Sequence, residues 1–169
     1  MAAEIDETPL PDEAPEPYVR RLALAKAEAV ARRQPGRLVL GADTTVTVDG
    51  AILGKAEGEA DARQMLERLA GRAHEVHTGV ALVDGSGSAV ACAMTRVWFD
   101  PMTSGDIQAY LASGEWHDKA GAYGIQGRIS RFVARVEGSY TNVVGLPVAL
   151  VWALLMRYPD GRGRDRSQP

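Results

Sequence analysis

The spacing of apolar residues alternates along the chain between the period of a helix and that of a strand. Apolar positions three or four residues apart predict helices over residues 18–34, 59–69 and 104–113, and from Pro147 onward. Continuous or alternating apolar runs predict strands within residues 38–55 and over residues 75–83 and 89–99. This order of elements is typical of an α/β fold. Because no repeat or linker divides the pattern, we expect a single domain over residues 1–158.

Turn and capping residues mark several boundaries of these elements. Asp49-Gly50 predicts a tight hairpin turn, and residues 84–88 predict the turn between the two long strands. Pro17 suits the first turn of a helix, and Thr103 is a candidate N-cap. Beyond the last helix, residues 160–169 contain two glycines and no apolar residue, so we expect a disordered tail over 159–169.

One buried strand ends its apolar run on a carboxylate. Residues 38–42 lead directly into Asp43, and burying an ionised aspartate without a partner is costly. At a strand end of an α/β fold, such a group more often faces a cleft and holds a metal, a water or a polar ligand. The returning strand ends on Lys55, so we expect Asp43 and Lys55 at one mouth of this cleft. A structural ion pair is the alternative, since such pairs place charges in the same way.

A second candidate site is the glycine-rich segment 118–128. Its glycines disfavour both a helix and a regular strand, and they let the backbone approach a ligand closely. Lys119 and Gln126 bracket this backbone. An ammonium suits a phosphate, and a carboxamide suits the edge of a base because it both donates and accepts. A tight structural loop is the alternative.

Composition and charge exclude several classes of function. The net charge is −3 and the basic residues are dispersed, which argues against binding a nucleic acid polymer. A single cysteine excludes an intrachain disulfide. We find neither a secretory signal nor an apolar run of membrane-spanning length, so we expect a cytoplasmic protein without a membrane partner. His74 and His77 point to opposite faces of a strand, so they form a poor metal pair and suit surface positions.

Seven short motifs carry a family resemblance. They occur in order at residues 5–8, 21–27, 41–44, 52–55, 74–80, 118–127 and 140–147. Together they closely resemble the Maf family of nucleoside triphosphate pyrophosphatases, and the resemblance extends from Glu4 to Leu155. The fold that it implies is an elongated α/β domain with a mixed sheet and a central cleft between two lobes. It also implies a homodimer.

The resemblance implies hydrolysis of a nucleoside triphosphate to a monophosphate and pyrophosphate, with Mg²⁺ or Mn²⁺. Asp43 matches the proton acceptor, and Glu7 matches an acidic position that helps Asp43 to hold the metal. Lys26 and Lys55 match basic positions that meet the phosphates. Thr44 and Gln126 match positions that select the base, and this pair resembles the subgroup acting on dTTP and UTP rather than on 7-methyl-GTP.

One expected motif is not found in these 169 residues. The family begins with an apolar strand and a Ser-x-Ser-Pro-Arg-Arg loop that cradles the phosphates. We expect a start codon placed too late, with a truncated paralogue as the alternative. Without this loop we expect low stability and feeble activity. A non-catalytic nucleotide-binding or septum-formation protein is therefore the second functional hypothesis.

Overall fold

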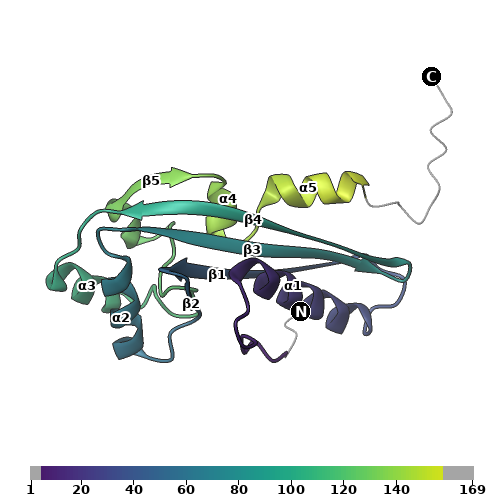
Figure 1. The fold of residues 1–169 in the computed structure, drawn as a ribbon, viewed down its shortest axis with the longest axis horizontal. Coiled ribbons are helices and arrows are strands. Elements are labelled where there is room, and N and C mark those ends of the chain that lie inside the picture. The colour runs from purple at the N-terminus through teal and green to yellow at the C-terminus, as the bar shows by residue number, and fades with distance from the viewer. Residues whose placement is uncertain (1–4, 158–169) are drawn as a thin grey trace, which may run out of the picture.

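The structure is a computed structural model that describes residues 5–157, and its centre is a five-stranded sheet (Figure 1). The strands are β1 (Val39–Val48), β2 (Ala51–Leu53), β3 (Ala73–Asp84), β4 (Gly87–Phe99) and β5 (Val133–Glu137), in the spatial order β2-β1-β3-β4-β5. The helices are α1 (Pro15–Ala31), α2 (Glu59–Leu69), α3 (Ser104–Leu111), α4 (Tyr140–Val144) and α5 (Val148–Arg157), with a 3-10 helix, η1 (Arg128–Phe132). The α/β class is confirmed. The tail predicted over 159–169 lies outside the described residues, and the single domain over 1–158 stays a prediction.

All strand pairs in the described part of the chain are antiparallel, whereas the resemblance implied a mixed sheet. The connections explain two of these pairs, because tight turns join β1 to β2 and β3 to β4 and so reverse the chain direction. Asp49 and Gly50 form the first turn with positive φ angles of 51° and 75°, as an Asp-Gly hairpin turn requires. The second turn is tighter than predicted, since β4 already begins at Gly87.

The backbone of helix α1 lies very close to β1 and β3 at two glycines, Gly41 and Gly79. A Cβ atom on Gly41 would lie 2.3 Å from the carbonyl oxygen of Ala23, and one on Gly79 would lie 2.2 Å from that of Val19. The side chains of Ala23 and Ala27 are fully buried in this contact. Because glycine leaves no side chain at these two strand positions, the helix backbone rests directly on the sheet.

The largest core cluster lies where α2, α3 and residues 116–129 pack on the sheet around Val46, Val76 and Val97. His74 belongs to this buried region and not to the surface, contrary to the sequence-based expectation. Its ring contacts those of Phe99 and Tyr123 edge to face, which explains why an imidazole is accepted there.

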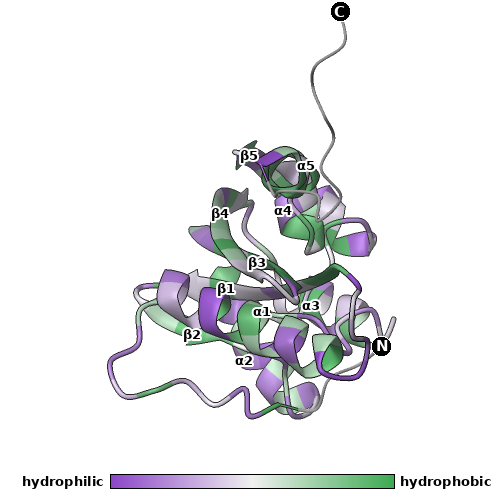
Figure 2. Cartoon of the chain, turned by 90° about the vertical axis from the view of Figure 1, so that its right-hand side faces the viewer, coloured by the Kyte–Doolittle hydropathy of each residue, from purple (hydrophilic) through white to green (hydrophobic). Residues whose placement is uncertain are grey.

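The molecule is elongated, with β3 and β4 running along its long axis (Figure 1). In this view α2 and α3 lie at one end of the sheet, and α1 lies toward the other. Figure 2 shows α5 as a largely apolar helix next to α4, on the far side of the molecule from α2. Within residues 5–157, none of the helices has both the length and the apolar character that crossing a membrane requires.

Several boundaries differ from the prediction. Helix α1 begins at Pro15 rather than at residue 18, and its first turn includes Pro17 as expected. Thr103 caps α3 and forms a reciprocal capping box with Asp106, although the helix ends at Leu111. The elements η1, β5 and α4 were not predicted, because each has only five residues and such short segments show little periodicity.

Candidate functional site

A pocket of about 290 Å³ lies beside the edge of β1, between α1, the end of β2, the glycine-rich segment and α4. Strand β2 pairs only with residues 46–48 of β1, so in the described structure no strand covers the edge at Asp43 and Thr44. Consecutive residues of a strand point to opposite faces. At this open edge both side chains nevertheless line the same pocket. The pocket corresponds to the cleft that the sequence predicted.

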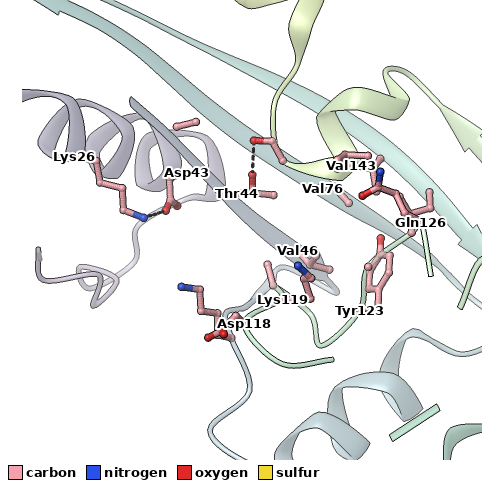
Figure 3. A pocket seen from close by; sticks show the side chains of 17 residues that line it. Lys26, Asp43, Thr44, Val46, Val76, Asp118, Lys119, Tyr123, Gln126 and Val143 are labelled. Atoms are coloured by element: carbon pink, nitrogen blue, oxygen red, sulfur yellow. Dashed lines mark hydrogen bonds and ion pairs between the residues drawn. The ribbon is translucent and has the colours of Figure 1, made fainter. Parts of the chain in front are cut away.

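An aspartate and a lysine meet at one end of the pocket (Figure 3). The Nζ atom of Lys26 on α1 lies 2.5 Å from Oδ1 of Asp43 and 2.7 Å from Oε1 of Glu7. The Asp43 side chain is 9% exposed and that of Lys26 is 23% exposed. Glu7 therefore reaches the site through Lys26 and is not itself part of the pocket lining.

Burial and charge act in opposite directions on these groups. Burial raises the pKa of Asp43, the hydrogen bond from Lys26 lowers it, and the net result is a pKa above its usual range. For Lys26, burial lowers the pKa, but the hydrogen bonds to Asp43 and Glu7 outweigh it and the pKa is raised. At neutral pH the ammonium is therefore firmly charged, whereas the carboxylate holds its proton more tightly than a solvated aspartate does.

Two further lysines line the pocket. Lys55 follows β2 and pairs with Ala120 in an isolated bridge, which ties the end of this hairpin to the glycine-rich segment. Its charge also lowers the pKa of Asp43, although less than burial raises it. Lys119 lies in the segment itself, with its aliphatic stem beside Gly124. Lys26 and Lys55 thus bring positive charge close to Asp43, and Lys119 adds a third positive charge to the pocket lining.

Polar groups of another kind lie across the pocket. Figure 3 shows Gln126 and Tyr123 opposite Lys26 and Asp43, with Thr44 between these two ends. The wall next to Thr44 is formed by residues 143–145. One end of the pocket therefore carries charge, and the other offers an amide, a hydroxyl and apolar surface.

The structure also shows pocket residues to which the sequence analysis gave no role. Among them are Asp118, Tyr123 and residues 143–145. They lie inside the motifs 118–127 and 140–147, so the family resemblance pointed to the segments but not to the individual side chains. Asp118 has a φ of 58°, and this left-handed conformation begins the turn that carries Lys119 to the pocket.

The glycines of segment 118–128 serve mainly to pack against the protein. A Cβ atom on Gly127 would lie 2.0 Å from Oε2 of Glu115, and one on Gly121 would lie 3.0 Å from the Val46 side chain. Gly121 also has a φ of 66° and donates a hydrogen bond to the carbonyl of Gly54. The segment is thus both a tight structural loop and a wall of the pocket, so the two sequence-based alternatives are compatible.

Fold and pocket together define an α/β protein with a charged ligand pocket at an open sheet edge. The family model described as "Maf-like protein" matches residues 1–158, and the chain belongs to this family.

Its relatives include the "dTTP/UTP pyrophosphatase" of Symbiobacterium thermophilum, which is 50% identical over 155 residues, or 92% of this chain and 80% of the relative. A protein of Myxococcus xanthus with the same name is 53% identical over 156 residues, or 92% of this chain and 79% of the relative. A third, from Aromatoleum aromaticum, is 49% identical over 151 residues and covers 86% of this chain and 73% of the relative.

Proposed function

We propose that this protein hydrolyses dTTP and UTP to the nucleoside monophosphate and pyrophosphate. One observation carries the proposal: a single pocket has Lys26 and the largely buried Asp43 carboxylate at one end, Gln126 and Tyr123 at the other, and Thr44 between them (Figure 3). Lys55 and Lys119 also line this pocket. A nucleoside triphosphate has the same polarity, with a polyanion at one end and a base at the other. The names of relatives that are about half identical to this chain support this choice of substrates.

In this proposal Asp43 is the general base. It accepts a proton from the attacking water while the water oxygen forms a bond to the α-phosphorus, and the bond from this phosphorus to the bridging oxygen breaks. Pyrophosphate leaves with the electron pair of that bond. A base is most effective when its pKa is close to the working pH, and the burial of Asp43 shifts its pKa in that direction.

The three lysines bind the phosphates in this proposal. Lys26, Lys55 and Lys119 bring positive charge to one small volume, and such charge is most effective where it meets the charge that develops in the transition state. Lys26 has a second task, because its hydrogen bond holds the Asp43 carboxylate in place.

A divalent cation, Mg²⁺ or Mn²⁺, completes the proposed site. Two carboxylates, Glu7 and Asp43, converge on the same ammonium, and carboxylate oxygens are ligands that both ions accept. Within residues 5–157 there is no group of three or more acidic, histidine or cysteine side chains that could hold a metal ion. Magnesium commonly binds through one or two carboxylates together with phosphate oxygens, so these two residues fit. When bound, the cation would neutralise charge on the phosphates.

Base selection falls to Gln126 and Thr44, since a carboxamide can pair with the imide edge of uracil or thymine. As part of the same proposal, the protein works in the cytoplasm as a homodimer on free nucleotides, without a nucleic acid polymer or membrane as partner.

The experiment is a measurement of pyrophosphate release from dTTP, UTP, CTP, GTP, ATP and 7-methyl-GTP with Mg²⁺. We expect dTTP and UTP to give the highest kcat/KM. A preference for a purine nucleotide would contradict the substrate assignment. Nucleotide binding without any turnover would favour the non-catalytic hypothesis instead.

A further inference from the structure

A network of buried polar groups connects the pocket to the sheet behind it. Thr44 and Thr78 are direct partners across β1 and β3, and their Oγ1 atoms lie 2.9 Å apart. Oγ1 of Thr78 donates to the carbonyl oxygen of Asn142, 3.2 Å away on α4. Thr44 lines the pocket, whereas Thr78 and Asn142 are fully buried. The pocket hydroxyl is therefore held from behind by two residues that no ligand touches.

Asn142 fixes this arrangement to two strands. Its Nδ2 atom donates to the carbonyl oxygen of Val76 and to Oγ1 of Thr95, each 3.0 Å away. The orientation of the amide follows from chemistry, since a backbone carbonyl can only accept. Its Oδ1 atom is buried without a partner among the described groups, which costs stability. A residue kept at such a cost has a task other than filling space.

Counting protons determines what Thr44 can offer to a ligand. Each threonine hydroxyl has one proton. If Thr78 donates to Asn142, the short contact between the two hydroxyls needs the proton of Thr44. If Thr78 instead donates to Thr44, the remaining partner for the Thr44 proton is the carbonyl oxygen of Gly145 at 3.5 Å, the contact drawn in Figure 3. The contact to Gly145 is longer than an ordinary hydrogen bond, so the first arrangement, with contacts of 2.9 and 3.2 Å, is favoured. In that arrangement the proton of Thr44 is used inside the protein.

We infer that Thr78 and Asn142 are positioning residues that make Thr44 a hydrogen-bond acceptor toward the base, so that the pocket selects bases presenting an N–H group. The inference rests on the proposed function and deepens it. The imide N3–H of uracil and thymine is such a group. Cytosine presents a bare N3 nitrogen at the same place, and its lone pair would face the lone pairs of Thr44.

With Thr44 as a fixed acceptor, the pocket can distinguish uracil and thymine from cytosine, which Gln126 alone cannot do. A carboxamide can turn over and offer either its oxygen or its nitrogen, so it can pair with uracil or with cytosine. A site discriminates strongly when a buried polar group would be left without a partner by the wrong base. Thr44 would become such a group once a bound base covers it, because Thr78 holds its hydroxyl in place.

The test compares binding of two non-hydrolysable nucleotides, α,β-methylene-UTP and α,β-methylene-CTP, by titration calorimetry with Mg²⁺. The variants are Thr78→Val, which removes the hydroxyl with little change of shape, and Thr78→Ser, which keeps it. We expect wild type and Thr78→Ser to bind the UTP analogue roughly tenfold or more tightly than the CTP analogue, as one hydrogen bond predicts. In Thr78→Val the Thr44 hydroxyl can turn, so this ratio should fall toward one.

The outcomes separate this inference from the proposed function. A folded Thr78→Val protein with the wild-type ratio overturns the inference, as does a wild type that binds both analogues equally or neither. Selective binding without pyrophosphate release contradicts only the proposed function. If Thr78→Val does not fold, the pair Thr44→Val and Thr44→Ser replaces it. The inference is supported if Thr44→Val loses the preference for the UTP analogue and Thr44→Ser keeps it. It is overturned if both variants keep this preference.

Discussion

At the scale of single residues, Asp43 shows how a functional group is held at a cost. Burial raises the pKa of Asp43 in spite of the hydrogen bond from Lys26, so ionisation of this carboxyl is less favourable in the folded protein than in the unfolded chain. The ionised form therefore lowers stability at neutral pH. Such a loss of stability is expected where a residue serves chemistry, which is the role proposed for Asp43.

We therefore predict that Asp43→Asn is at least as stable as wild type at pH 7 but nearly inactive. Because the folded-state pKa lies above the unfolded value, the penalty is present at neutral pH and disappears as pH falls below about 3.8. The stability advantage of Asp43→Asn should shrink accordingly in thermal melts between pH 7 and pH 3.5. A variant clearly less stable than wild type at pH 7 would contradict this view of the site.

The sequence predicted most of the individual residues of the site. It could not predict which of them contact one another. Six of the seven candidate residues line the pocket, and Glu7 contacts one of them, Lys26. Their roles stay predictions. The link from Thr44 through Thr78 to Asn142 depends on strand register and on the position of α4, which was itself not predicted. Neither follows from local sequence.

At the scale of elements, the packing of α1 on two glycines determines where Lys26 lies. In the sequence, Tyr18, Leu22, Ala25 and Ala29 form one apolar stripe at helical spacing, which predicts that these four residues are buried. The structure buries Tyr18 and Leu22, but with Ala23 and Ala27 in place of Ala25 and Ala29. In a helix rich in alanine, several faces have similar hydrophobicity, so periodicity alone does not choose between them. The choice is made by the close approach to β1 and β3, which the sequence pattern does not reveal.

Gly79→Ala tests this contact directly. The added methyl group would overlap the backbone of α1 at Val19, so we expect a loss of about 3 kcal/mol or more in the free energy of unfolding. Gly85→Ala is the matched control, since nothing lies within 4 Å of a Cβ atom there, and it should change stability little. Chemical denaturation measures both. Equal effects of the two substitutions would mean that close helix packing does not matter.

At the scale of the whole molecule, His74 makes the fold sensitive to acid. Burial lowers its pKa to about 4, because a charged imidazole is disfavoured among the packed rings of Phe99 and Tyr123. The Nε2 atom of His74 also lies 2.7 Å from the Tyr123 hydroxyl, so this side chain links β3 to the pocket wall. The sequence pattern could not reveal this, because the partners of His74 come from distant segments.

The sign of the effect follows from the lowered pKa. As pH falls below about 6.5, the unfolded chain binds a proton that the folded protein refuses, so stability decreases until about pH 4. The pKa of His74 is lowered from 6.5 to about 4, and each pKa unit corresponds to about 1.36 kcal/mol. The free energy of unfolding should therefore decrease by about 3 kcal/mol. His74→Gln removes this contribution, whereas His117→Gln, at an exposed position, should keep the wild-type behaviour. The free energy of unfolding is measured by chemical denaturation at several pH values from 7 to 4. If it decreases by the same amount in wild type and in His74→Gln, the prediction is contradicted.

The central claim is that the pocket cleaves a nucleoside triphosphate between its α- and β-phosphates. A phosphorus NMR spectrum of dTTP incubated with the protein and Mg²⁺ tests it most directly, since it identifies the bond that breaks. We predict that wild type forms only dTMP and pyrophosphate, and that Asp43→Asn forms these products roughly 10²- to 10⁴-fold more slowly. Formation of dTDP and orthophosphate, or equal rates for the two proteins, would contradict the account.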